Sequence, residues 1–135
     1  MQLPLGSIIA SGPVIIEDNK VLLNKERAPD GHITKWYFPG GETENFDIPL
    51  EETCRREAKE EMGIELEIIR PLATTLGHRS ENRIVILVHY LAKRIGEIKP
   101  GTDIVEWAWH DINNLPTDCA PNVYEIIKDY LQTAI

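Results

Sequence analysis

One segment decides how the rest of the chain is interpreted: residues 40–64, which read GGETENFDIPLEETCRREAKEEMGI. Its second half predicts a helix over 49–62, because a proline can open a helix, strong helix formers follow it, and Gly63 is a good C-terminal stop. Apolar side chains recur there every four residues, at Leu50, Cys54, Ala58 and Met62. This spacing predicts a narrow apolar stripe that faces a core.

The same predicted helix carries a group of acidic residues. Glu57, Glu60 and Glu61 are spaced i, i+3 and i+4, so their side chains share one face. Like charges in this arrangement repel each other by roughly 0.2–0.5 kcal/mol per pair, so helix stability alone does not favour them. Carboxylate oxygens are the ligands that Mg²⁺ and Mn²⁺ prefer. The face is therefore either a solvated surface, as runs of charge usually are, or a metal site suited to phosphate chemistry.

Two neighbouring features favour the metal site. Gly40 and Gly41 precede the helix, and their backbone can approach a ligand closely because they lack Cβ atoms. Arg56 lies beside the acids and can hold one carboxylate in place through a bidentate pair. Metal ions held here would neutralise a diphosphate, polarise a phosphorus–oxygen bond and lower the pKa of an attacking water.

Composition and charge restrict the class of protein further. The 135 residues, 42% of them apolar and 27% charged, suit one soluble domain with a hydrophobic core. A net charge of −8 argues against sequence-independent nucleic-acid binding, which needs a basic surface. No segment approaches the roughly 20 apolar residues of a membrane span, and the N-terminus lacks the basic region of a signal peptide. We therefore expect one cytoplasmic domain over 1–135, with both cysteines reduced.

The rest of the chain predicts strands around the acidic helix. They are expected at 7–17 and 20–24, joined by a turn at Asp18-Asn19, and at 36–38, 64–77, 82–93 and 104–110. Pro71 interrupts the strand-like material of 64–77, and the continuous apolar run in 82–93 is typical of a strand covered on both faces. A second helix is predicted around 123–131 from its helical spacing of apolar residues. Strands interleaved with two helices give a layered α/β or α+β domain.

These residues resemble the Nudix box: a glycine, five residues, a glutamate, seven residues, then Arg-Glu-apolar-x-Glu-Glu-x-Gly-apolar. Every fixed position of its second half is matched, by Arg56, Glu57, Ala58, Glu60, Glu61, Gly63 and Ile64. The preceding WYFPGG of 36–41 and the later Trp109 and Leu115-Pro116 are also similar to the family, so the resemblance covers most of the chain. The first half departs from the pattern: it is one residue longer, Asp47 replaces the glutamate, and Phe46 replaces a glycine.

The resemblance implies an α/β/α sandwich with a mixed β-sheet and a loop–helix–loop metal site. It implies that Glu57, Glu60 and Glu61 bind Mg²⁺, with Mn²⁺ as an alternative ion, and that either Glu60 or Glu61 could instead be the general base. Arg56 would orient a carboxylate. The glycine at 41 and the one at 63 would permit the loop geometry.

The resemblance also implies site residues outside the helix. Relatives often add an acid from a late loop as a base or an extra ligand, for which Glu106 is the first choice and Asp103 the second. Each could equally be an ordinary surface residue. Lys25 and Arg27 follow the second strand, where relatives often have a phosphate-binding base, although a solvated strand end is the alternative. Gly40 and Gly41 would complete the substrate-binding loop.

The reaction implied by the resemblance is hydrolysis of a nucleoside diphosphate linked to another moiety. Nucleoside triphosphates are the favoured substrates, and ADP-ribose or another nucleotide sugar is the alternative. The altered first half of the box leaves open a nucleotide-sensing binding module with little catalysis, and an acidic helix alone leaves open a purely structural protein. The expected partner is a nucleotide-like small molecule, with no nucleic acid and no membrane, and relatives are commonly homodimers.

Overall fold

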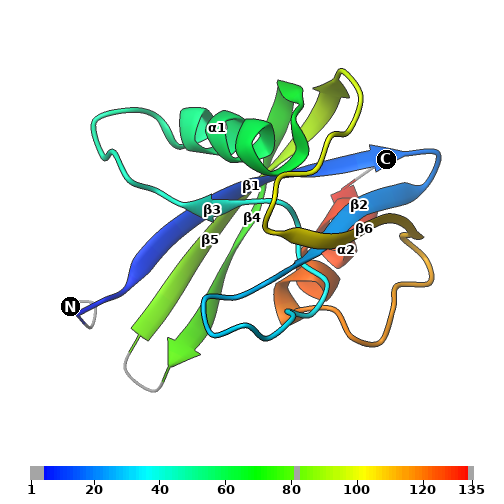
Figure 1. Ribbon diagram of the computed structural model, residues 1–135. Coiled ribbons are helices and arrows are strands. Elements are labelled where there is room, and N and C mark those ends of the chain that lie inside the picture. Colours follow the sequence, from blue (N-terminus) through cyan, green and yellow to red (C-terminus); the bar gives the residue numbers. More distant parts are fainter. Residues whose placement is uncertain (1–4, 81–82, 134–135) are drawn as a thin grey trace.

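The computed structural model describes residues 5–80 and 83–133, without the side chains of residues 79 and 80 (Figure 1). Its elements are β1 (Ile8–Glu17), β2 (Lys20–Glu26), β3 (Gly41–Glu42), α1 (Leu50–Met62), β4 (Glu65–Ser80), β5 (Arg83–Ile95), β6 (Ile104–Asp111) and α2 (Pro121–Thr133). The predicted first hairpin is confirmed. Asp18 and Asn19 form its turn with φ of 51° and 62°, the left-handed conformation that two-residue hairpin turns require.

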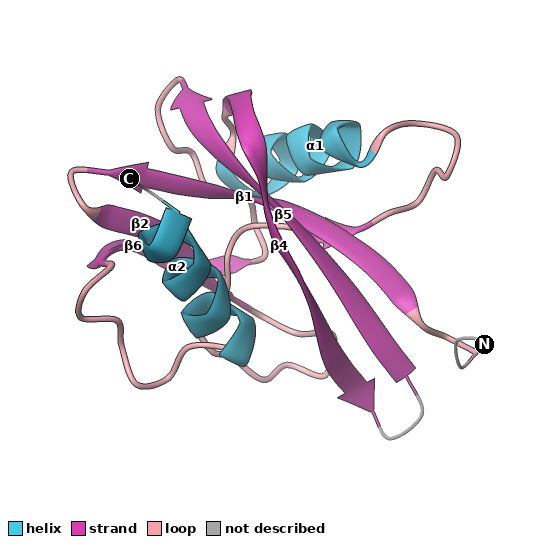
Figure 2. Ribbon diagram, turned by 180° about the vertical axis from the view of Figure 1, so that it is seen from behind, coloured by secondary structure: helices cyan, strands magenta, loops and turns pink. Residues whose placement is uncertain are grey.

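The strands form one mixed sheet with a helix on each face. Their order is β4-β5-β1-β2-β6, and β3 pairs with β1 beside this path. Residues 8–15 of β1 run parallel to residues 85–92 of β5, whereas β2, β6 and β4 join the sheet by antiparallel pairing. Figures 1 and 2 show α1 and α2 on opposite sides of the sheet. The predicted α/β/α sandwich is therefore confirmed.

Each helix buries an apolar stripe against its own face of the sheet. The stripe of α1, with Cys54, Ala58 and Met62 fully buried, packs in one cluster with Leu22 of β2. In α2, the apolar positions Val123, Ile126 and Ile127 pack in a second cluster against the other face. Both predicted helices are thus confirmed, each to within two residues at the ends. Within the described residues, neither helix is long and apolar enough to cross a membrane.

The alternation of side chains along β2 determines what each helix faces. Leu23 packs in the cluster of α2 and Leu22 in the cluster of α1, because successive residues of a strand point to opposite faces. The same alternation directs Lys25 toward the α2 face, and Asn24 and Glu26 toward the α1 face. The acidic helix is therefore opposed by polar side chains at the end of β2.

The prediction of a strand at 36–38 is wrong. The segment makes only single bridges, from Tyr37 to Asn24 of β2 and from Trp36 to Cys119. Neighbouring residues of this segment bind different partners. Tyr37 exchanges two backbone hydrogen bonds of 2.8 Å with Asn24, whereas the Trp36 carbonyl accepts a hydrogen bond from the Ala120 N–H. Pro39 then removes the next backbone donor, so no ladder can continue.

The β4–β5 hairpin extends past both helices, so the prediction that 82–93 is covered on both faces is wrong. Residues 84–88 of β5 are only half-buried. A helix of 13 residues is about 20 Å long, whereas the 16 residues of β4 span roughly 50 Å. Pro71 lies within β4 and does not end it, with register shifts on either side. An edge strand can hold a proline because one of its sides needs no donor.

Candidate active site

The C-terminal end of α1 is fixed by backbone hydrogen bonds from a distant loop. Gly63 ends the helix with a left-handed φ of 67°, as predicted. The loop after β5 then donates from the Lys99 N–H to the Met62 carbonyl and from the Gly101 N–H to the Glu61 carbonyl, both at 2.8 Å. These bonds satisfy carbonyls that the helix itself leaves unpaired. They also bring the late loop against the acidic face of the helix.

A small hollow of about 180 Å³ lies between the acidic face and this loop. Its lining includes all three predicted carboxylates of α1 together with Asp103. The Asp103 carbonyl accepts a 3.0 Å hydrogen bond from the Arg27 N–H, which ties the loop to the end of β2. The structure therefore brings Glu57, Glu60, Glu61 and Asp103 to one place.

The three carboxylates of α1 have different surroundings. Glu57 is only 8% exposed and lies against Gly41, where a Cβ atom would stand 2.4 Å from its Oε2. Glu61 Oε2 accepts a 2.9 Å hydrogen bond from the backbone N–H of Gly40. The Glu60 side chain is mostly exposed. A side chain at residue 41 would displace the Glu57 carboxylate, and the backbone of Gly40 fixes that of Glu61.

Arg56 contacts several carboxylates instead of forming the expected bidentate pair with one. Its Nη2 lies 3.2 Å from Glu57 Oε1, and its Nη1 lies 3.5 Å from Oε1 of both Glu60 and Glu44. Nη2 also donates to the Glu42 carbonyl at 2.9 Å. Arg56 therefore links the loop before the helix to Glu57 and Glu60 of the acidic face.

Burial and mutual repulsion favour the protonated forms of the Glu57 and Glu61 carboxyls. Burial raises the pKa of Glu61 to about 9, and the charge of Glu26 adds to the effect. Burial likewise raises the pKa of Glu57 to about 7, against a lowering contribution from Arg56. Both groups are therefore acids that a nearby cation would help to ionise.

Glu26 is an acidic residue of the site that the sequence analysis missed. Burial, followed by the charge of Asp103, raises the pKa of its carboxyl. It ends β2 on the face toward α1, where its charge acts on Glu61 and Glu57. The alternation of Leu22, Asn24 and Glu26 on one face of a strand is the signal that could have identified it.

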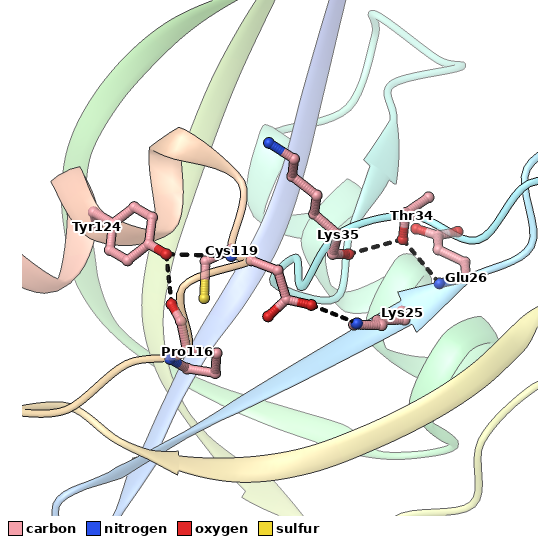
Figure 3. A network of polar contacts seen from close by, with 8 residues as sticks. Lys25, Glu26, Thr34, Lys35, Pro116, Cys119 and Tyr124 are labelled. Atoms are coloured by element: carbon pink, nitrogen blue, oxygen red, sulfur yellow. Dashed lines mark hydrogen bonds and ion pairs between the residues drawn. The ribbon is translucent and has the colours of Figure 1, made fainter.

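Lys25 and Glu106 lie on the other side of the sheet from the carboxylates of α1. Lys25 Nζ is 2.6 Å from Asp118 Oδ2 and 5.0 Å from the centre of the Trp36 ring. Figure 3 shows Lys25 among polar contacts that also involve Cys119 and Tyr124. Glu106 is paired directly opposite Lys25 in β6, so it shares that face. Arg27 is exposed and reaches the site through its backbone alone.

A larger groove of about 730 Å³ is lined in part by Gly40 and Gly41, the two glycines that contact Glu61 and Glu57. Its walls combine apolar residues of β1, β4 and β5 with the start of α2. His89 is buried in this wall, with its ring 4.9 Å from that of Phe38 and its Nε2 3.2 Å from Asn122 Nδ2. Burial lowers the pKa of His89 to about 4, so the ring is neutral. The volume is that of a typical small-molecule site.

The oxygen donors around the hollow fit a hard divalent cation, although they are held apart in this structure. Among residues 5–80 and 83–133, no three His, Cys, Asp or Glu side chains stand close enough together to hold a metal ion. Glu57 and Glu60 contact Arg56, and Glu61 contacts Gly40. All the available donors are carboxylate or carbonyl oxygens, which suit Mg²⁺ and Mn²⁺. Rotation of the glutamates toward the hollow would be needed to bind the ion.

Comparison with known proteins identifies the family. A family model described as the NUDIX domain matches residues 8–130. An ADP-ribose pyrophosphatase of Methanocaldococcus jannaschii is 32% identical over 133 residues, covering 97% of this chain and 77% of that protein. The crystal structure of a MutT NUDIX hydrolase from Burkholderia pseudomallei superposes with a TM-score of 0.80 at 26% identity, covering 91% of this chain and 97% of that one. The chain therefore belongs to the Nudix family of hydrolases.

The fold is shared with more distant members as well. A MutT protein from Methanosarcina mazei Go1 superposes with a TM-score of 0.81 at 20% identity, over 99% of this chain and 98% of that one. At this identity the likeness concerns the fold. The departure of this chain in the first half of the box has thus left the architecture unchanged: Asp47 and Phe46 lie exposed in the loop between β3 and α1.

Proposed function

We propose that this chain hydrolyses the diphosphate linkage of a nucleoside diphosphate bound to a second moiety, and that it does so with Mg²⁺ or Mn²⁺. The observation that carries the proposal is the acidic hollow at α1 together with a groove of nucleotide size, whose lining residues Gly40 and Gly41 contact Glu61 and Glu57 of the hollow. Nudix hydrolases generally use divalent metals such as Mg²⁺. A substrate lying in the groove would therefore present its diphosphate to the acidic face.

Glu57, Glu60 and Glu61 are the residues that would hold the ion. When bound there, a divalent ion would neutralise the diphosphate and lower the pKa of an attacking water. Arg56 would keep Glu57 and Glu60 oriented, and the missing side chain of Gly41 leaves room for the Glu57 carboxylate. A carboxylate of the same cluster that is not engaged by the ion would take the proton of the water.

Asp103 is a better candidate than Glu106 for the additional late acid. Asp103 lines the hollow beside the carboxylates of α1. Glu106 shares a strand face with Lys25 and is directed toward α2. The groove-lining backbone of Gly40 and Gly41 is a better candidate than Lys25 for contact with the phosphates, because the Lys25 ammonium is engaged by Asp118.

The substrate class that we propose is a nucleoside diphosphate linked to a sugar, with ADP-ribose as the first candidate. This reverses the order implied by the sequence, where nucleoside triphosphates came first. The reason is that the 32% identical relative is an ADP-ribose pyrophosphatase. Phe38 and the neutral His89 belong to the lining of the groove, whose volume has room for the ring of a base or a sugar.

The test is product release from a panel of nucleoside triphosphates, ADP-ribose, other nucleotide sugars and dinucleoside polyphosphates, each with Mg²⁺, with Mn²⁺ and with chelator. We expect metal-dependent conversion of ADP-ribose or another nucleotide sugar into a nucleoside monophosphate and a sugar phosphate. Pyrophosphate release from triphosphates alone would move the substrate class back to triphosphates. If nucleotides only raise the melting temperature and nothing is cleaved, the chain is a binding module.

Without divalent metal, the protein should lose stability as the pH rises from about 5 to 9. The carboxyl pKa values of Glu57 and Glu61 are raised from 4.5 to about 7 and about 9, so the folded state retains protons that the unfolded state releases. Their contribution is complete below pH 4.5 and is lost as the pH passes through those two values. Mg²⁺ should oppose the loss, because it binds the ionised forms. Melting temperatures measured across this pH range, with chelator and with Mg²⁺, test the prediction. If the chelator curve and the Mg²⁺ curve run parallel, the prediction is contradicted.

A further inference from the structure

Gly77, inside β4, is a glycine that the fold itself does not require. Its φ lies outside the left-handed region, and a Cβ atom there would meet no described atom within 4 Å. It pairs with Val85 of β5, and its neighbours on both sides are paired in the same register, so no bulge accounts for it. A glycine inside a strand weakens the strand and commonly marks a point where a ligand approaches the backbone.

Gly12 of β1 shows the contrast, since it lines the same groove as Gly77 but is needed for packing. A Cβ atom at residue 12 would lie 1.9 Å from the Pro39 carbonyl oxygen, so this position excludes every side chain. The space that a side chain would fill is occupied by backbone at Gly12 and is open at Gly77. The open space beside Gly77 is therefore part of the groove.

The pairing of the strands shows that a side chain at residue 77 would project into the groove. Val85, Leu87 and His89 alternate along β5 and all line it, as does Ala10 of β1, which is paired with Leu87. Directly opposed residues of an antiparallel pair lie on the same face of the sheet. A side chain at Gly77 would therefore stand beside that of Val85, and its absence widens the groove.

The wall around Gly77 is apolar, and the opposite rim is polar. The β4–β5 hairpin extends past both helices (Figures 1 and 2), and Val85 and Leu87 remain half-buried there. On the rim, Asp30 and His32 belong to the loop after β2, and Asp30 Oδ1 accepts a 3.0 Å hydrogen bond from the His32 N–H. The flat face of a nucleobase needs no hydrogen-bond partners, so it fits the apolar wall better than a sugar, whose hydroxyl groups need them.

We propose that the nucleobase of the substrate lies against the β4–β5 hairpin at Gly77, and that this glycine determines which substrates the groove admits. The proposal rests on the proposed function, which makes the substrate a nucleotide. A larger side chain at residue 77 would occupy the space of the base without touching the acidic hollow. It would therefore weaken binding of the substrate and leave the chemical step unchanged.

The test is a graded series, Gly77→Ala, Gly77→Val and Gly77→Phe, assayed by steady-state hydrolysis of ADP-ribose in Mg²⁺, or of whichever nucleotide wild type cleaves. We expect KM to rise with the size of the side chain, by roughly 10-fold or more for Gly77→Val, with kcat changed by no more than about threefold. Calorimetric titration then compares the two ends of ADP-ribose. Gly77→Val should bind AMP roughly 10-fold more weakly than wild type and should bind ribose 5-phosphate equally well.

Thr74→Val is the matched control for Gly77→Val. Thr74 is exposed on the same strand and is opposed to Val88, which packs in the cluster of α1, so its side chain lies on the other face. This control should change neither KM nor AMP binding. Valine suits a strand, so Gly77→Val should melt no lower than wild type. Should Gly77→Phe fail to fold, the comparison of the alanine and valine variants carries the test.

The outcomes separate this proposal from the proposed function. If wild type hydrolyses a nucleotide but Gly77→Val keeps the wild-type KM, the position of the base is refuted and the proposed function stands. If Gly77→Val loses affinity for ribose 5-phosphate and not for AMP, the sugar occupies this wall and the proposal is refuted. If wild type cleaves nothing, the proposed function fails and AMP binding decides alone: weaker binding by Gly77→Val supports the position, and equal or absent binding refutes it.

Discussion

Replacing Glu60 and Glu61 together by glutamine is expected to lower turnover by roughly 10³-fold or more while leaving the fold intact. The loss follows because two of the three carboxylates assigned to the ion become neutral, and metal stabilisation of the transition state contributes several kcal/mol. The fold should survive because a glutamine oxygen can still accept the Gly40 N–H in place of Glu61 Oε2. Steady-state hydrolysis and a thermal melt, both in Mg²⁺, measure the two effects.

The control for this double variant removes two charges elsewhere. Glu67→Gln with Glu97→Gln changes two exposed residues, one on β4 and one in the loop after β5, so turnover should stay within a factor of two. Without metal, the Glu60→Gln, Glu61→Gln protein should be at least as stable as wild type, because helical repulsion is reduced. Retention of more than a tenth of wild-type turnover would contradict the role assigned to the acidic face.

Gly12→Ala is expected to destabilise the protein by at least about 3 kcal/mol, and to disrupt the site as well. A Cβ atom at residue 12 of β1 would lie 1.9 Å from the Pro39 carbonyl oxygen and 2.8 Å from Gly40 Cα. Both neighbours are backbone, so no side chain can rotate to make room. The segment that would be displaced carries the Gly40 N–H bound by Glu61. Denaturant unfolding measures the stability, and Mn²⁺ affinity measures the effect on the site.

Gly77→Ala is the matched substitution for Gly12→Ala. Gly77 lies in β4, and a Cβ atom there would meet nothing within 4 Å. Gly77→Ala should change the free energy of unfolding by no more than about 1 kcal/mol, because it alters only the flexibility of the unfolded chain. If both alanine variants unfold at the same denaturant concentration, the close approach of β1 to the Pro39–Gly40 backbone has no energetic importance.

The sequence was most informative where local signals agreed with one another. Helix α1 could be predicted because propensity, a four-residue apolar spacing and the stop at Gly63 all indicated the same boundaries. The segment 36–38 could not, because three apolar aromatic residues are typical of a strand. Its two bridges, to Asn24 and to Cys119, depend on elements far along the chain.

Of the candidate site, the carboxylates of the helix could be predicted from the sequence, and the acids from other elements could not. The spacing of Glu57, Glu60 and Glu61 is a local property of a helix, so it was visible in the sequence. Whether Glu106 or Asp103 faces that helix depends on the pairing of β2 with β6 and on the register shift next to Glu26. That pairing joins residues about 80 positions apart, and nothing in the local pattern of either strand defines it. The alternation along β2 indicates the face on which Glu26 lies, but the approach of Glu26 to Asp103 depends on this long-range pairing.

The late loop positions Asp103 through main-chain contacts, which has a consequence for how the family can diversify. The Lys99, Gly101 and Arg27 amides make the bonds that fix the loop. Main-chain donors are common to every residue type except proline, so most side chains of the loop can change over time without moving the acid. Gly101 is the exception, since a Cβ there would lie 2.6 Å from the Glu60 carbonyl. The loop can therefore acquire new substrate contacts while the acid beside the helix keeps its position.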